Sequence, residues 1–388
     1  MPANNKKRCI LIGIIAFFGG VVITVGVGAA MMLGMGNFIF ANKSDYKVME
    51  EFYKEYQDLS AVDTAIDNYY YKDTSDVDRS EAACKAIVSQ LGDKYSSYMT
   101  AKEYENFKAS ATGDYSGVGV TFAQDEDGNF VILSITEGSP AAKSELEIGD
   151  YILKVDGKSY KDQDVIATKI RGSKGTKVEI TYQHKSKVKK VTLTRENIKI
   201  KSVKSKKLDD NTGYISIDQF ISETASDFEK ALDKLVSKGC DSVVVDLRDN
   251  GGGLVSEAVD IADLFIDSGV ITYTEDRNGQ RQEYKANNSK RDIKLVVLVN
   301  ENSASSSEIL AGALKDNGYK VVGEKTFGKG IIQQTMELDD GSAIKLTVAQ
   351  YFSPKGNKVH KKGITPDYVV KNSTSTDKQL NKALSILN

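Results

Sequence analysis

The fold is indicated most strongly by Val243-Val244-Val245-Asp246-Leu247-Arg248-Asp249-Asn250-Gly251-Gly252-Gly253. Its first residues form a short apolar run that suits a buried β-strand, and a helical pattern follows from Leu254 to Ile266. The same order recurs at Leu295 to Val299, an expected strand, and Ser305 to Leu314, an expected helix. Further strands are expected at Tyr319 to Gly323, Gly330 to Leu338 and Ala343 to Tyr351. This alternation predicts an α/β layered core.

The composition excludes several classes of protein. The 388 residues suggest about two to three domains, and 52 Lys plus Arg against 54 Asp plus Glu argue against a dedicated nucleic-acid binder. Three Cys cannot form a Cys-rich zinc module. The only histidines are His184 and His360, both of which we expect to be exposed and structural. Any histidine-based catalysis or metal binding would depend on these two residues.

The N-terminal segment differs from the rest of the chain. Lys6, Lys7 and Arg8 precede an uncharged stretch in which residues 10–33 are almost wholly apolar. About 20 helical residues span a bilayer, and basic residues stay on the cytoplasmic side. The prediction is a single-pass membrane protein with a cytoplasmic N-terminus and an extracytoplasmic catalytic part. The alternative is a cleaved signal peptide, although its apolar region would be unusually long.

The chain divides into five expected regions. Residues 45–111 show helical spacing, and residues from about 115 to 195 show short strands separated by turns. Gly117-Val118-Gly119-Val120, followed by the Gly149-Asp150 turn, resembles a PDZ domain, whose glycine loop binds a carboxylate while a strand edge pairs with a peptide. The expected boundaries are 1–41 (cytoplasmic tip and anchor), 42–111 (helical), 112–195 (PDZ), 196–371 (α/β) and 372–388 (tail and short helix).

Three loops that follow strands of the α/β section could support chemistry. In the first, Gly251 to Gly253 would let backbone N–H groups approach a ligand, as an oxyanion hole requires. The loop lacks the ending of a phosphate-binding P-loop, and a plain tight turn is the alternative.

The second loop contains four serines, at positions 303, 305, 306 and 307. A serine at a strand-to-helix turn could be a nucleophile, with the following N–H stabilising an oxyanion. The pair Ser305 and Glu308 also fits a capping box, which would be purely structural. The local pattern does not decide between the two.

The third loop places Lys329 between Gly328 and Gly330. Burial would lower the pKa of this lysine, so that its neutral amine could act as a base. In a strand beginning at Lys329, Gln333 would lie on the same face and could hydrogen-bond the amine. A surface lysine is the alternative.

Together with Leu91 to Tyr98 and Gly363 to Asp367, these motifs resemble the carboxyl-terminal processing peptidases, or tail-specific proteases, of the S41 serine peptidase family. The resemblance implies a PDZ domain inserted before an α/β, ClpP/crotonase-like, Ser-Lys peptidase core that needs no cofactor or metal. It implies protein substrates with apolar C-terminal tails and permits a homodimer. The implied site residues are Ser305 (nucleophile), Lys329 (base), Gln333 (assisting), Gly252 and Ser306 (oxyanion hole), and Gly117, Val118, Gly119 and Val120 (PDZ).

Two positions depart from the family pattern. Ser306 replaces an alanine beside the implied nucleophile, and Gly251 replaces a proline in the glycine loop. Neither change removes a backbone donor. The competing hypothesis is a non-catalytic PDZ adaptor at the membrane, for which the retained Ser305, Lys329 and Gln333 would have no use. A trypsin-like peptidase with a PDZ domain would need a histidine before His184, and none is present.

Overall fold

The computed structural model describes residues 43–75, 77–125, 128–161, 163–287, 290–372 and 376–388. The expected membrane segment at residues 10–33 lies outside these ranges. Among the helices in them, none is both long enough and apolar enough to span a bilayer.

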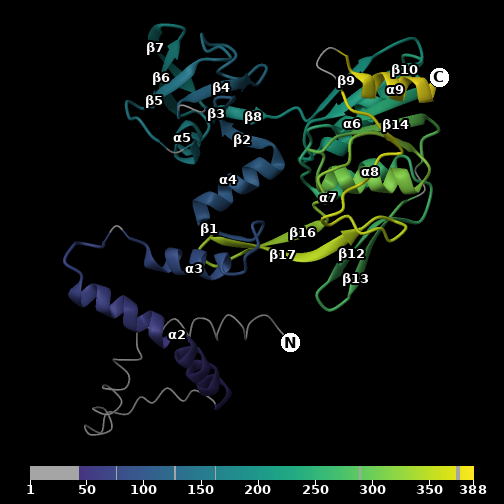
Figure 1. The fold of residues 1–388 in the computed structure, drawn as a ribbon. Helices are drawn as coiled ribbons and strands as arrows, with labels where there is room; N and C mark the ends of the chain where they lie inside the picture. The colour runs from purple at the N-terminus through teal and green to yellow at the C-terminus, as the bar shows by residue number, and fades with distance from the viewer. Residues whose placement is uncertain (1–42, 76, 126–127, 162, 288–289, 373–375) are drawn as a thin grey trace. The chain divides into compact units, whose positions relative to one another are not determined.

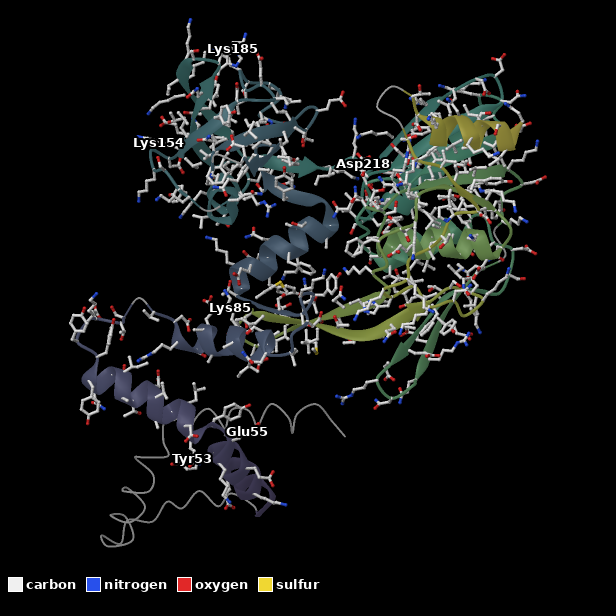
Figure 2. The ribbon with its side chains drawn as sticks, in the orientation of Figure 1. Tyr53, Glu55, Lys85, Lys154, Lys185 and Asp218 are labelled. Atoms are coloured by element: carbon white, nitrogen blue, oxygen red, sulfur yellow. The ribbon has the colours of Figure 1, made fainter. Side chains whose placement is uncertain are left out.

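The described residues form two compact units, which meet in sequence at Cys84 and Lys85. In the first, α2 (Lys43–Tyr69) is followed by the start of α3 (Arg79–Ser89). The Arg79 guanidinium joins the two helices by ion pairs of 2.8 Å to Asp63 and 2.6 Å to Asp67. Tyr53 projects from α2 and is exposed (Figure 2).

The expected helical region up to residue 111 contains a strand as well. The second unit has α4 (Ala101–Thr112), which begins with a capping box between Thr100 and Glu103. Before it, β1 (Ser97–Met99) pairs with a strand far along the chain. Sequence periodicity suggested only helix here, because a three-residue strand is too short to show a period of two.

A separate hydrophobic core holds the PDZ-like section. Its sheet has the order β3-β4-β5-β6-β7, so one edge of β3 carries no neighbouring strand in the described part of the chain. Strands expected at Phe130 to Ile135 and Tyr151 to Val155 are confirmed, whereas α5 was not expected. The elements are β2 (Asp114–Gly117), β3 (Val120–Gln124), β4 (Phe130–Ile135), β5 (Tyr151–Val155), α5 (Gln163–Ile170), β6 (Lys177–His184) and β7 (Lys187–Thr194), with β8 (Glu196–Lys199) paired to β2.

The α/β section is built on a six-stranded sheet (Figure 1). All neighbouring pairs are parallel except β9 with β10. Its strands, in spatial order, are β18 (Tyr368–Val369), β15 (Lys320–Gly323), β14 (Lys294–Val299), β11 (Ser242–Asp246), β10 (Thr212–Ile217) and β9 (Val203–Lys207).

Helices cover both faces of this sheet because its strands are apolar on both sides. Val243 and Val245 pack with α6, α7 and α8, whereas Val244 packs with α9 on the opposite face. The alternation follows from the two-residue period of a strand. The helices are α6 (Thr224–Val236), α7 (Val255–Asp263), α8 (Ser306–Asp316) and α9 (Lys378–Leu387).

A second sheet contains the strands that follow the lysine loop. It has the order β1-β17-β12-β13, and β16 also pairs with β17. The new strands are β12 (Val270–Asp276), β13 (Arg281–Lys285), β16 (Ile331–Glu337) and β17 (Ala343–Phe352). The sequence indicated β16 and β17 but not β12 or β13. Pairing of β1 with β17 fixes the segment before α4 to this sheet.

The parallel order brings the three loops together. The loops after β11, β14 and β15 leave the sheet at the same edge, since the carboxyl ends of parallel strands lie side by side. The glycine loop, the serine loop and the lysine loop therefore meet there.

Gly323 at the end of β15 is expected to tolerate no side chain. Its φ is +136°, and a Cβ would lie 1.8 Å from the Val299 carbonyl oxygen. Gly323→Ala should lower the free energy of unfolding by more than about 2 kcal/mol, measured by urea unfolding. Gly318→Ala is the control, because φ is also positive there, at +96°, but no atom lies within 4 Å of the added Cβ. Equal losses in the two variants would contradict this account.

Candidate active site

Ser305 lies at the turn between β14 and α8 in a strained backbone conformation. Its φ of 56° and ψ of −115° are uncommon for a residue with a side chain. The turn is held from two sides. The Ser305 N–H donates to Glu308 Oε2 at 3.0 Å, and Gly252 approaches so closely that a Cβ there would lie 2.7 Å from the Ser305 Cβ. The glycine loop and the serine turn are therefore packed directly against each other.

The four serines differ in the hydrogen bonds that their hydroxyl groups make. Three of them donate to backbone carbonyl oxygens of the glycine loop: Ser303 to Leu247 at 2.7 Å, Ser306 to Gly253 at 2.8 Å and Ser307 to Asn250 at 2.9 Å. Among the bonds of the described residues, the Ser305 hydroxyl donates to no carbonyl. Ser305 is thus the serine whose hydroxyl is not used to fasten this loop.

The expected oxyanion donors lie beside Ser305. The Ser306 N–H is at the first position of α8, where a helix offers no internal acceptor. Gly252 is in contact as expected, but its N–H donates to Asn250 Oδ1 at 2.8 Å. Asn250 is itself buried and donates through Nδ2 to the Ile217 carbonyl oxygen at 2.7 Å. In this conformation, an oxyanion would have to replace the Asn250 side chain as the acceptor for Gly252.

The buried carboxyl group of Glu308 joins the Ser305 turn to the lysine loop. Besides the Ser305 N–H, Glu308 accepts from the Thr326 hydroxyl at 2.5 Å, the Gly328 N–H at 2.7 Å and the Lys329 N–H at 2.8 Å. Burial raises the pKa of Glu308, and these four donors oppose that rise by stabilising the ionised form. The interaction between Ser305 and Glu308 that the sequence predicted is therefore one of several bonds by which Glu308 links the two loops.

A tyrosine hydroxyl joins the same two segments. The Tyr351 hydroxyl on β17 lies 3.0 Å from the carbonyl oxygen of Ser305 and 2.8 Å from that of Lys329. Its side chain is almost completely buried, which raises the pKa of the phenol well above its usual value and keeps it a donor. Sequence reasoning missed Tyr351, because no local pattern shows a contact between residues so far apart in the chain.

Lys329 has the environment expected of a base, although it does not contact Ser305 here. Burial, the main cause, lowers the pKa of the Lys329 amine, and nearby Lys345 lowers it further. Its Nζ lies 4.8 Å from the centre of the Tyr95 ring. No hydrogen bond joins this Nζ to Ser305 in the described part of the chain. The amine therefore lies over the Tyr95 ring.

Gln333 has a different partner from the one expected. Its Nε2 donates to Thr347 Oγ1 at 3.3 Å, because the two residues are directly paired between β16 and β17. The expected hydrogen bond to the Lys329 amine is absent among the described residues. The strand begins at Ile331 rather than at Lys329, so the lysine is not part of the regular strand pairing that would place it on the same face as Gln333.

Neither histidine is fully exposed, so that expectation was wrong. His184 in β6 is half-buried, with Nδ1 2.8 Å from Asp150 Oδ1. His360 is half-buried beside Gly330, and its Nδ1 has no hydrogen-bond partner in the described ranges. Those ranges also contain no cluster of three His, Cys, Asp or Glu side chains that could hold a metal ion.

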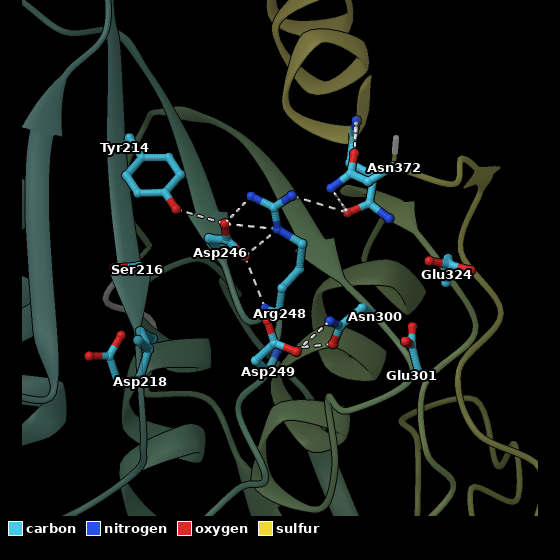
Figure 3. A pocket seen from close by; sticks show the side chains of 12 residues that line it. Tyr214, Ser216, Asp218, Asp246, Arg248, Asp249, Asn300, Glu301, Glu324 and Asn372 are labelled. Atoms are coloured by element: carbon cyan, nitrogen blue, oxygen red, sulfur yellow. Dashed lines mark hydrogen bonds and ion pairs between the residues drawn. The ribbon is translucent and has the colours of Figure 1, made fainter. Parts of the chain in front are cut away.

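A polar pocket of about 510 Å³ lies on the α9 side of the sheet edge (Figure 3). Its centre is Arg248, which donates to Asp246 and to both carboxylate oxygens of Asp377, each at 2.9 Å. Asp377 is the residue before α9. The pocket does not include Ser305, Lys329 or Gln333. Through its bonds to Asp377, Arg248 connects the start of α9 to the loop that continues into Asn250 and Gly252.

Comparisons with known proteins identify two sections of the chain. Family models match residues 116–194 as a PDZ domain and residues 211–370 as peptidase family S41. A probable CtpA-like serine protease of Staphylococcus haemolyticus is 37% identical over 364 residues, covering 91% of this chain and 71% of that protein. One of Staphylococcus saprophyticus is 36% identical over 354 residues, covering 89% and 70%.

Among solved structures, the photosystem II D1 C-terminal processing protease is 28% identical with a TM-score of 0.52, covering 86% of this chain and 90% of that one. This likeness extends over the PDZ section and the α/β core together. The chain therefore belongs to peptidase family S41, the serine peptidases whose CtpA-like members it resembles along most of its length.

Proposed function

We propose that this protein is an exported, membrane-anchored endopeptidase that binds the C-terminal tails of protein substrates and cleaves them with Ser305 and Lys329. The observation that carries the assignment of these two residues is their shared support. Glu308 and Tyr351 each hydrogen-bond the backbone of both Ser305 and Lys329. Two residues 24 positions apart in the sequence (305 and 329) are thereby held as one unit.

In the proposed reaction the Ser305 hydroxyl attacks the carbonyl carbon of the peptide bond while the Lys329 amine takes its proton. The Ser306 N–H and a glycine-loop N–H stabilise the resulting oxyanion. Lys329 then protonates the leaving amine, and the acyl-enzyme is hydrolysed by water with Lys329 again accepting a proton. Proton transfer requires hydrogen-bond reach, so the flexible Lys329 side chain turns from Tyr95 toward Ser305 before the first step.

The PDZ section supports tail binding. The Gly117 to Val120 turn leads into β3, whose outer edge has no strand partner among the described residues. An extended peptide could pair with that edge while the preceding turn holds its carboxylate. The membrane anchor rests on the sequence alone, from the apolar residues 10–33 and the basic residues before them.

Ser305→Ala should abolish cleavage of an unfolded protein with an apolar tail and labelling by an active-site serine probe. Alanine at 303, 306 or 307 should leave most of the activity, while each of these variants loses one bond to the glycine loop and about 1 kcal/mol of stability. A Ser305→Ala protein that cleaves normally would exclude this nucleophile. Wild-type protein that binds tails but is not labelled would instead favour the adaptor.

Activity should increase with pH through the lowered pKa of Lys329, because only the neutral amine can accept the serine proton. The pH dependence of kcat/KM measures this. Lys329→Ala should reduce activity to a trace without that dependence. The assignment fails if Lys329→Ala keeps the wild-type pH profile.

Glu308→Gln should impair the site even though its shape is conserved. A glutamine retains one acceptor oxygen but places an NH₂ group against N–H donors that now bond the carboxylate. We expect a loss of about 2 to 4 kcal/mol in stability and a large fall in serine labelling. Wild-type labelling together with wild-type urea unfolding would show that the shared carboxylate is not needed.

A further inference from the structure

The segment Asp93–Ser96 belongs to a motif that the proposed reaction does not use, yet it lies against Lys329. We propose that Asp93 and Tyr95 are positioning residues of the catalytic site, which hold the Lys329 amine and set how readily it takes up a proton. This inference rests on the proposed role of Lys329 as the base.

The topology fixes this segment beside the lysine loop. Ser97 pairs with Lys345 and Met99 with Ala343, so β1 extends the sheet along β17. Just before β1, the Ser96 hydroxyl accepts the Thr347 N–H at 3.0 Å. Because β17 also pairs with β16, which begins just after Lys329, the segment and the lysine loop are held by the same strand.

Tyr95 makes the direct contact. Its ring centre lies 4.8 Å from Lys329 Nζ, within the range of a cation–π interaction. The negative face of an aromatic ring favours the ammonium form over the neutral amine. Tyr95 therefore holds the amine over its ring and stabilises the charged form there.

Asp93 supports Tyr95 and adds a negative charge. Its carboxylate accepts the Tyr95 N–H at 3.0 Å and the Ser96 hydroxyl at 2.6 Å. It also hydrogen-bonds the Thr347 side chain, which accepts the Gln333 amide at 3.3 Å. Gln333 is thus connected to Lys329 through Thr347 and Asp93 rather than directly.

Charges from several elements face Lys329. Lys345 on β17 and Lys94 beside Asp93 disfavour the ammonium form, whereas Asp93 and Glu308 favour it. Two further titratable groups adjoin: Tyr351, which bonds the Lys329 carbonyl oxygen, and His360, which interacts with Asp93.

Of the two carboxylates, Asp93 is the one that can be neutralised without breaking the support of Ser305. Glu308 bonds the backbone of both catalytic residues, whereas the partners of Asp93 are Tyr95, Ser96 and Thr347. An asparagine would keep an acceptor oxygen for the Tyr95 N–H. Asp93→Asn therefore isolates the effect of the charge.

The test is the pH dependence of kcat/KM for Asp93→Asn. Loss of the negative charge should lower the pKa of Lys329. The acid limb, meaning the part of the pH profile in which kcat/KM rises from its low-pH value, should therefore move to lower pH by about 0.5 unit or more. At a pH well below that limb, activity should rise about threefold, since the neutral fraction grows by that factor.

Asp340→Asn is the matched control. Asp340 accepts the Ser342 N–H at 2.9 Å and its hydroxyl at 2.6 Å, in a turn like that of Asp93, but it is not among the charges that act on Lys329. Its acid limb should coincide with that of the wild type. Coincident limbs for Asp93→Asn and wild type would overturn the proposal.

A second pair of variants decides the matter if Asp93→Asn does not fold. Tyr95→Leu removes the ring and should move the limb in the same direction, whereas Tyr95→Phe should not move it. If the acid limb of Tyr95→Leu, like that of Tyr95→Phe, matches the wild-type limb, the proposal is overturned. Lys329→Ala separates this failure from failure of the proposed function. If Lys329→Ala is inactive while the acid limbs of the Asp93 and Tyr95 variants match that of the wild type, only the proposed role of Asp93 and Tyr95 is wrong.

Discussion

The candidate site depends on one buried carboxyl group, that of Glu308. A carboxylate such as that of Glu308 is strongly disfavoured inside a protein unless donors surround it. Here the donors come from the Ser305 turn and from the lysine loop, so the hydrogen bonds to Glu308 hold the backbone of Ser305 and Lys329 to the same group. The parallel sheet makes this possible, because β14 and β15 are neighbours and deliver their following loops to the same place. The Tyr351 hydroxyl then joins the two segments from a different sheet.

The hydrogen bonding of Ser306 gives a structural role to one departure from the family pattern. The hydroxyl of Ser306, where the pattern has an alanine, donates to the Gly253 carbonyl oxygen and so adds a bond between the serine turn and the glycine loop. The other departure has no such consequence. Gly251 is exposed, and an added Cβ would meet no atom within 4 Å, so nothing in its surroundings requires a glycine there. The hydroxyl groups of Ser303, Ser306 and Ser307 hold the glycine loop in place, and position 251 carries no rigid proline.

Sequence reasoning reached the features whose cause is local. The strands at Val243 and Leu295, the α/β alternation and the three loops follow from short apolar runs and glycines, and the structure contains them. Contacts between distant segments could not be predicted from the sequence. Nothing near Tyr351 or Tyr95 in the chain indicates that one bonds the Lys329 carbonyl and the other covers its amine. Gln333 was assigned the wrong contact for the same reason, because its partner Thr347 is chosen by the register of β16 and β17.

The link between Arg248 and the C-terminal helix has a consequence for the order of assembly. Asp377 and Gln379, which bond Arg248, follow every proposed catalytic residue in the chain. A nascent chain that has been synthesised as far as Gln333 contains all of the proposed catalytic residues, yet the loop leading to Gly252 still lacks Asp377 and Gln379. During synthesis, the loop that leads to Gly252 therefore gains these bonds from Arg248 only after Asp377 and Gln379 have been made.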